Sequence, residues 1–284
     1  MSDSIHKKIQ FLENQLQDLE RQKTSLQTEL KNTQEELQKL PSILPLSPSP
    51  IANKTFSPEE KIKIFMNLFR GRADVFPKRW NNSKTGKSGY SLSCSNEWVR
   101  GKCNKPKIKC SQCPNQVFIP PTTEIIRKHL GGEDFAGSKR DYTIGIYPML
   151  ADDTCWFLAV DFDKDKWRQD VSAFTKTCNK RGVPFALERS RSGNGGHVWI
   201  FFEKPIQAAQ ARKMGSALLT ETMDDYPEIG FESYDRFFPN QDTLSPRGFG
   251  NLIALPLQHF PRERGNSVFL DEDFEGFDHH SHLA

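Results

Sequence analysis

The order of apolar segments between residues 150 and 260 constrains the fold of this chain more than any other feature. Trp156–Asp163 (WFLAVDFD) has the length of a buried strand. The amphipathic segment that comes after this strand ends at Gly182, a residue typical of a helix C-terminus. The later elements are expected to be a helix over 167–181, strands over 183–188 and 197–202, a helix from Pro205 and a strand over 229–238. This order predicts an α+β, ferredoxin-like (βαββαβ) fold. A further strand over 251–257 is expected to extend the sheet.

Two aspartates close the first of these strands. Asp161 and Asp163 are two residues apart, so both carboxylates are expected on one face of the sheet while Phe162 packs on the other. Carboxylates held this close repel each other unless a cation lies between them, and Mg²⁺ or Mn²⁺ prefers such oxygen ligands. The fourth strand of a ferredoxin-like sheet lies beside the first, so Asp235 is expected to complete the site. A pair of such ions serves phosphoryl transfer to a 3′-hydroxyl.

His197 begins the third strand, on the other side of the first, directly after the glycine-rich loop 192–196 (SGNGG). Glycines let backbone amides approach a phosphate closely, and a histidine at the end of the loop can donate to a triphosphate oxygen. Taken singly, each element has an ordinary explanation: a solvated strand end, a turn, a structural histidine. Their coincidence on strands that the fold brings together favours a nucleotide-binding catalytic site.

Taken in order, these motifs resemble those of a known family. DFD (161–163), SGNGGH (192–197) and SYDRFFPNQD (233–242) resemble the three motifs of archaeo-eukaryotic primases. The segments LFRGRADVF (68–76), NEWVRGKC (96–103) and GFGNLIALPLQ (248–258) resemble one branch, the primase-polymerases of TOTE conflict systems and the similar CRISPR-associated primase-polymerases. The resemblance covers roughly residues 58–275. It implies template-dependent synthesis of nucleic acid on a palm like an RNA-recognition module.

The resemblance also implies roles for particular residues. Asp161, Asp163 and Asp235 would hold two Mg²⁺ or Mn²⁺ ions. The phosphates of the incoming nucleotide would be bound by His197, Ser192 and Arg191, with Asn251 as a further contact to nucleotide or template. Glu232 and Asp242 are alternatives for the third acid, and Asp235 is preferred because it lies inside the expected strand. The implied partners are a single-stranded DNA template, a primer strand, ribo- or deoxynucleoside triphosphates, and helicase, nuclease or CRISPR adaptation proteins.

Four cysteines form a second motif. They lie within 20 residues at the spacing C-x8-C-x6-C-x2-C: Cys94, Cys103, Cys110 and Cys113. Four thiolates satisfy tetrahedral Zn²⁺ with no open position, so an insertion over 90–115 is expected to be a structural zinc unit, part of an N-terminal α/β unit. An iron–sulfur cluster is the alternative. Cys155 and Cys178 are expected in the core.

The cysteine segment is also basic. From Arg70 to Lys109 there are eleven Lys or Arg and two acids, with Trp80, Tyr90 and Trp98 among them. Basic groups interleaved with aromatic rings suit a nucleic-acid backbone and its bases. The expected nucleic-acid contacts are Arg70, Arg72, Arg79 and Lys102. A solvated basic face is the alternative interpretation.

The N-terminal 40 residues predict a coiled coil. Two apolar seams repeat every seven residues, with Lys23 and Thr33 as interruptions: Ile5, Leu12, Leu19, Leu26 and Leu40, and Ile9, Leu16, Leu30 and Leu37. Self-association or a partner helix is expected; a single helix lying on the rest of the protein is the alternative. Residues 41–56 read as a Pro/Ser-rich linker, and Ser57-Pro58 with Glu60 is expected to start the catalytic domain, 57–284.

Bulk features and rival functions complete the prediction. The chain has no apolar run of membrane-spanning length and no secretion signal at its N-terminus, so a cytoplasmic protein without a membrane partner is expected. The main rival to the enzyme is a non-catalytic single-strand-binding module, but paired aspartates on a phosphate-binding face would repel its ligand. A nucleotide cyclase would not need the basic cysteine segment.

Overall fold

The computed structural model describes residues 2–39, 56–132 and 141–277. The chain divides into two compact units, residues 1–54 and 55–284. In the first unit, helix α1 spans Ser2–Lys39, and the side chains of Ile9, Leu12, Leu16 and Leu19 are 48–61% exposed along it. The predicted linker over 41–56 lies, apart from Phe56, outside the described residues.

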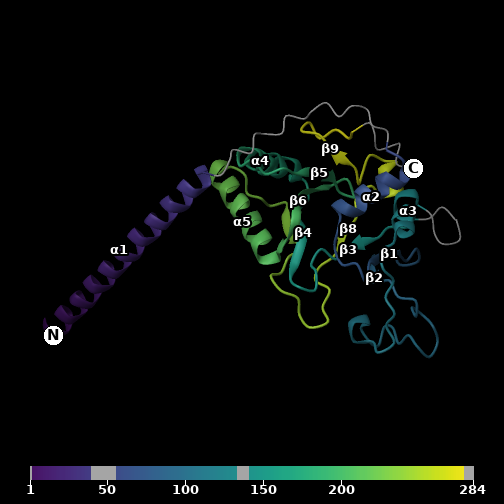
Figure 1. The fold of residues 1–284 in the computed structure, drawn as a ribbon, viewed down its shortest axis with the longest axis horizontal. Coiled ribbons are helices and arrows are strands. Elements are labelled where there is room, and N and C mark those ends of the chain that lie inside the picture. Colours follow the sequence, from purple (N-terminus) through teal and green to yellow (C-terminus); the bar gives the residue numbers. More distant parts are fainter. Residues whose placement is uncertain (1, 40–55, 133–140, 278–284) are drawn as a thin grey trace. The chain divides into compact units, whose positions relative to one another are not determined.

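The second unit contains a five-stranded antiparallel sheet (Figure 1). Its elements follow one another in the predicted order: β4 (Thr154–Asp163), α4 (Trp167–Lys180), β5 (Ala186–Arg189), β6 (Gly195–Gln207), α5 (Ala208–Asp225) and β7 (Tyr234–Phe238). The strand order is β7-β4-β6-β5-β9, where β9 spans Phe269–Leu270. The first predicted strand therefore lies between the fourth and the third, as expected.

Smaller elements surround this sheet. They are α2 (Pro58–Leu68), the hairpin β1 (Pro77–Asn81) and β2 (Ser88–Leu92), the 3-10 turn η1 (Cys110–Gln112), α3 (Thr123–Gly131), β3 (Gly145–Ile146), β8 (Ile253–Ala254) and α6 (His259–Arg262). Helix α2 begins with the predicted capping box: Ser57 N donates to Glu60 Oε2 at 2.8 Å, and Glu60 N donates to Ser57 Oγ at 3.2 Å. This reciprocal pair satisfies two amides that the first helical turn leaves free.

Both faces of the sheet are buried, because alternate side chains of β4 enter two different cores. Phe162 and Val160 pack with Phe174 and other residues of α4 and α5. Phe157 and Trp199 pack on the opposite face with residues of α2 and α3. The result is a mixed α/β domain in which one face of the sheet is turned toward the N-terminal elements of this unit.

Three predicted elements differ from the structure. β8 pairs with β3 in a separate two-stranded sheet, so the segment 251–257 does not extend the main sheet, and β9 takes the fifth place instead. β6 continues through Pro205 to Gln207, where it pairs with Thr154, so the helix begins at Ala208. Proline is tolerated because the pairing with β4 is irregular between Cys155 and Phe157, where no amide donor is required.

The third difference is the length of β7, which begins at Tyr234 rather than at residue 229. Phe231 has a positive φ of 49°, a backbone conformation that ends regular strand geometry before Ser233. The buried Asp170 carboxylate accepts from Ser233 N at 3.1 Å and from Ser233 Oγ at 2.5 Å, which holds the turn ahead of the strand. Among the described residues, no helix has the length and apolar character that crossing a membrane requires.

Candidate active site

Strand register places three polar side chains in one row across the sheet. Asp161 on β4 pairs directly with His197 on β6, and His197 pairs with Glu188 on β5. Because directly paired residues point to the same face of a sheet, all three side chains lie on the face that also carries Trp199. Phe162 points to the other face, into the core beneath α4. The alternation predicted for residues 161–163 therefore holds.

Three carboxylates meet beside this row. Asp161, Asp163 and Asp235 each place one oxygen so that all three atoms lie within 4.8 Å of one another. Asp161 is only 9% exposed, and its buried Oδ1 atom makes no close hydrogen bond, with His197 Nε2 3.4 Å away. Burial and the nearby Asp161 charge raise the pKa of Asp163. A buried, unsatisfied oxygen within a group of like charges is the arrangement that a hard divalent cation relieves, so these residues fit Mg²⁺ or Mn²⁺.

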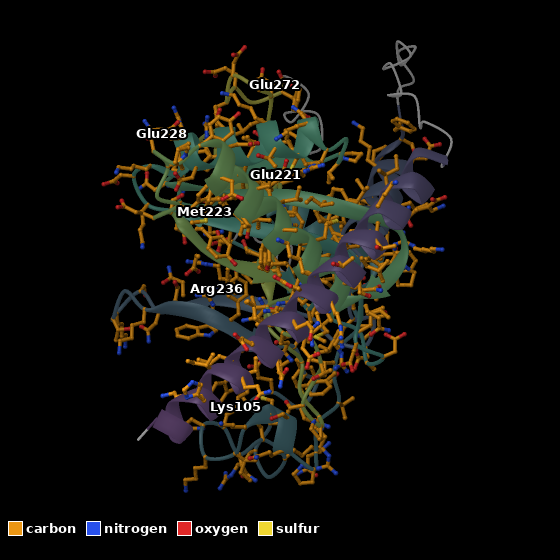
Figure 2. All side chains as sticks on the ribbon, turned by 90° about the vertical axis from the view of Figure 1, so that its left-hand side faces the viewer. Lys105, Glu221, Met223, Glu228, Arg236 and Glu272 are labelled. Atoms are coloured by element: carbon orange, nitrogen blue, oxygen red, sulfur yellow. The ribbon has the colours of Figure 1, made fainter. Side chains whose placement is uncertain are left out.

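Arg236 supplies positive charge at the edge of the three carboxylates. Its Nε atom donates to Asp235 Oδ2 at 2.6 Å, and its backbone pairs with Asp161 across β7 and β4. In Figure 2, Arg236 lies between α5, marked by Glu221, and the cysteine segment, marked by Lys105. The positive charge of the guanidinium partly offsets the repulsion among the three carboxylates.

The two alternatives for the third acid lie elsewhere. Glu232 lies before β7 begins, and its carboxylate is 3.5 Å from Lys166 Nζ. Asp242 pairs with Arg212. Only Asp235 of these three acids joins the group with Asp161 and Asp163.

The glycine-rich loop is shaped by close approaches. A Cβ atom at Gly195 would lie 2.5 Å from Asp163 Oδ1 and 2.6 Å from the Phe162 carbonyl oxygen, so only glycine leaves room for this carboxylate. Gly193 has a φ of +83°, which glycine adopts without strain. Ser192 Oγ accepts from Asn194 N at 3.2 Å and lies 3.1 Å from Ser190 Oγ. These contacts set the loop against the carboxylates.

His197 is held between two carboxylates. Its Nδ1 atom lies 2.9 Å from Glu188 Oε2, and its Nε2 atom lies 3.4 Å from Asp161 Oδ1. Burial lowers the pKa of His197, but the Glu188 charge and the contacts with Asp161 and Glu188 outweigh it and raise the pKa to about 10. A protonated imidazole held in this way suits a phosphate oxygen.

Arg191 is bound within the protein. Its guanidinium donates to Asp141, to Thr143 Oγ1 at 3.0 Å and to Gln258 Oε1. Arg79 of β1 donates to the same Asp141 carboxylate at 3.0 Å. Burial raises the pKa of Asp141, but hydrogen bonds from Thr143 and Arg191 and the two guanidinium charges lower it overall. Asp141 thus ties the β1–β2 hairpin to the glycine-rich loop.

The other expected contacts are placed as follows. Asn251 Oδ1 accepts from Asn240 N at 3.2 Å, and its Nδ2 donates to Phe237 O at 3.0 Å, so the amide fastens the end of β7. The Arg70 guanidinium lies 3.4 Å above the Trp156 ring, and Arg72 is paired with Asp74. Lys102 is exposed. The structure brings the catalytic candidates together, whereas these residues lie outside the group of carboxylates.

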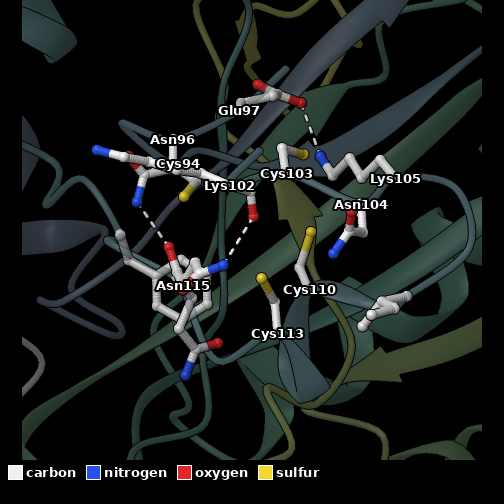
Figure 3. A pocket seen from close by; sticks show the side chains of 13 residues that line it. Cys94, Asn96, Glu97, Lys102, Cys103, Asn104, Lys105, Cys110, Cys113 and Asn115 are labelled. Atoms are coloured by element: carbon white, nitrogen blue, oxygen red, sulfur yellow. Dashed lines mark hydrogen bonds and ion pairs between the residues drawn. The ribbon is translucent and has the colours of Figure 1, made fainter. Parts of the chain in front are cut away.

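The four cysteines line one pocket in the loops after β2 (Figure 3). The Cys94 thiol accepts from Val117 N at 3.3 Å, and Lys105 Nζ, which donates to Glu97 at 2.7 Å, lies near Cys110. Within the described residues, the three aspartates are the group of ligating side chains that comes together closely enough to hold an ion. The thiols offer the soft donor set that zinc or iron prefers.

Two residues of the site carried no functional prediction. In the sequence, Glu188 is the polar end of a short strand. Asp141 is the first described residue after 133–140, which the structure does not describe. A carboxylate ending an apolar strand nine residues before a histidine is a weak signal. It becomes informative only when the antiparallel register of β5 and β6 is known.

Comparison with known proteins adds one finding. A family model described as the TOTE conflict system, Archaeo-Eukaryotic Primase domain, matches residues 60–283. Comparison with curated proteins gives no match.

Proposed function

The chain belongs to the archaeo-eukaryotic primase domain family of TOTE conflict systems, and we propose that it is a primase-polymerase that joins nucleotides along a single-stranded DNA template. Family membership supports a primase-type nucleotidyltransferase function. The observation that carries the finer proposal is the convergence of Asp161, Asp163 and Asp235 within 4.8 Å. A protein that only binds nucleic acid gains nothing from three carboxylates on its ligand-binding face.

The carboxylates are proposed to hold two Mg²⁺ or Mn²⁺ ions. When bound, such ions lower the pKa of an attacking hydroxyl and stabilise charge on phosphate oxygens. The protein contributes the position of each ligand: β4 supplies Asp161 and Asp163, and β7 supplies Asp235 from the neighbouring strand. Gly195 leaves room for the Asp163 carboxylate beside the glycine-rich loop.

Nucleotide phosphates are proposed to bind between the carboxylates and the glycine-rich loop. The His197 imidazole lies in the row next to Asp161 and, when protonated, supplies a positive donor. Ser192 and the loop amides lie at the start of the same strand, and Arg191 stiffens the loop through Asp141. The expected contact from Asn251 would be indirect, through its hold on β7.

The cysteine segment is proposed to be a structural zinc unit that helps to bind the template. Its four thiols line one pocket and match the donor preference of Zn²⁺. Lys102 and its basic neighbours Arg100, Lys107 and Lys109 are exposed. Trp98 is 70% exposed and adopts a positive φ of 63°, an uncommon conformation for so large a residue. An exposed indole among lysines suits base stacking on a single strand.

Helix α1 is proposed to pair with a second copy of itself. The described part of its seam is 48–61% exposed within the chain: Ile9, Leu12, Leu16 and Leu19. In a parallel pair, Lys8 at a g position would face Glu13 at an e position of the second copy, an attractive contact. Leu16→Lys should shift a dimer to monomer in light scattering after size exclusion. A wild-type chain that stays monomeric at high concentration would contradict the pairing.

Primer synthesis tests the enzymatic proposal. The protein is incubated with unprimed single-stranded DNA, Mg²⁺ or Mn²⁺ and labelled ribo- or deoxynucleotides, beside Asp161→Asn/Asp163→Asn. Glu221→Gln, a carboxylate on α5 paired with Arg181, serves as the matched control. We expect short products from the wild type and the control, and none from the double variant.

The outcomes separate the alternatives. Extension of a supplied primer without products on unprimed DNA would identify a polymerase that does not start chains. Absence of synthesis in both assays, with DNA binding unchanged by the double substitution, would overturn the enzymatic proposal in favour of a binding module.

A further inference from the structure

Glu188 is a buried carboxylate to which the proposed function assigns no role. It is 1% exposed and lies on β5, next to Leu187 in the core. Burying a carboxylate costs several kcal/mol unless hydrogen bonds and opposite charge compensate it. A buried carboxylate that accepts three hydrogen bonds, on the strand next to His197, therefore indicates a specific role.

Glu188 accepts hydrogen bonds from three side chains, one of which is His197. Its Oε2 atom accepts from His197 Nδ1 and from Trp199 Nε1, both at 2.9 Å. Its Oε1 atom accepts from Ser267 Oγ at 3.3 Å. Trp199 is fully buried, and its ring stands edge-on to the imidazole with centroids 6.1 Å apart. The buried Trp199 and Ser267 thus hold the carboxylate in place, and the carboxylate in turn holds the histidine.

This arrangement settles the orientation of the imidazole. An ionised carboxylate only accepts, so Nδ1 carries a proton and donates it to Glu188. Turning the ring over would put carbon in place of this nitrogen, and the buried Oε2 atom would lose one of its two hydrogen bonds and keep only the one from Trp199 Nε1, which is costly. Nε2 is consequently the nitrogen directed toward Asp161 and the group of carboxylates.

We propose that Glu188 is a positioning residue that holds His197 with Nε2 directed at the phosphates of the incoming nucleotide. The inference rests on the proposed function for its ligand, a triphosphate. The geometric part of the inference depends only on the row of Glu188, His197 and Asp161. Glu188 itself contacts no substrate in this proposal and acts only through the imidazole.

Two variants separate the effects of charge and geometry. Glu188→Gln keeps an acceptor oxygen for His197 while removing the charge, and Glu188→Ala removes both. Glu221→Gln again serves as a charge-loss control outside the site. The probes are inorganic tripolyphosphate and deoxyadenosine triphosphate, with affinity measured by calorimetry in Mg²⁺ buffer. The ring nitrogens of His197 are followed by ¹⁵N NMR, with His197→Gln to assign the signals.

We expect Glu188→Ala to weaken tripolyphosphate binding about 10-fold or more, as loss of a charge-assisted hydrogen bond implies. The Nδ1–H signal of His197 should be lost, and KM for the nucleotide should rise more than kcat falls. Glu188→Gln should retain the Nδ1–H signal and recover part of the affinity. Unchanged affinity in Glu188→Ala, with only a lower Tm, would reduce Glu188 to a structural residue and overturn the inference.

Failure of this inference differs from failure of the proposed function. A chain that binds tripolyphosphate in a Glu188-dependent way but synthesises no strand would support the positioning role and overturn the polymerase. Strand synthesis that is insensitive to Glu188→Ala would support the polymerase and overturn the positioning role.

Discussion

Repulsion among the three carboxylates is expected to destabilise the folded protein when no metal is bound. The ligand oxygens of Asp161 and Asp163 lie within 4.8 Å, where two unit charges repel by about 3 kcal/mol at an effective dielectric constant near 20. Asp163 is partly exposed and Arg236 and His197 lie close by, so the net relief on removing one charge is expected to be about 1 kcal/mol. Asp163→Asn should therefore raise the Tm of the metal-free protein by about 2–4 °C.

The same variant should lose its response to metal. At a Mg²⁺ concentration about 100 times Kd, binding to the folded state alone stabilises the wild type by about 2.7 kcal/mol, or roughly 5–11 °C in Tm. The assay is thermal unfolding after passage over a chelating resin, with and without Mg²⁺. Mg²⁺ is preferable to a transition metal because thiols bind it poorly, so the cysteine pocket does not contribute.

Asp242→Asn is the matched control. Asp242 was an alternative third acid, but it pairs with Arg212 away from the group of carboxylates. This variant should keep the full Mg²⁺ shift. The reasoning would be refuted by a wild-type-sized shift in Asp163→Asn, or by loss of the shift in Asp242→Asn.

Three further outcomes are expected. Gly195→Ala places a Cβ 2.5 Å from Asp163 Oδ1, so it should lower the free energy of unfolding by about 1–3 kcal/mol in chemical denaturation. It should also abolish the Tm shift that Mg²⁺ produces, and an intact shift would contradict the close approach. Trp98→Ala should weaken single-stranded DNA binding about 5- to 100-fold in fluorescence anisotropy without changing Tm, whereas exposed Met223→Ala should not; equal affinities would remove the stacking role. Burial lowers the pKa of His129 to about 4, so folding keeps it neutral. Its contribution is complete above pH 6.5 and falls by about 3 kcal/mol toward pH 4, and urea unfolding of His129→Gln should show a shallower pH dependence than the wild type.

Local patterns determined most of the elements. Alternation within WFLAVDFD predicted that Asp161 and Asp163 share a face and that Phe162 enters the core, and both hold because successive side chains of a strand point to opposite faces. Ser57, Pro58 and Glu60 predicted the start of α2 because capping depends on neighbours three residues apart. The order of strands and helices followed from the same short-range periodicities.

Pairing between distant segments was decided by the tertiary structure. Nothing within 251–257 tells which strand will accept its hydrogen bonds, and β8 joins β3 instead of the main sheet. Pro205 looked like a helix start because its missing amide is harmless there, but an irregular stretch of pairing made it equally harmless within β6.

The site shows the same division. Residue types and spacing indicated the three aspartates and His197, since their chemistry can be recognised one motif at a time. Glu188 acquires its meaning only from the register that sets it opposite His197, and Asp235 is separated from Glu232 only by where β7 begins. The sequence by itself determined which faces and chemical groups this protein presents. Only the packing of both faces of the sheet decided which of those groups meet, because register depends on contacts between residues far apart in the chain.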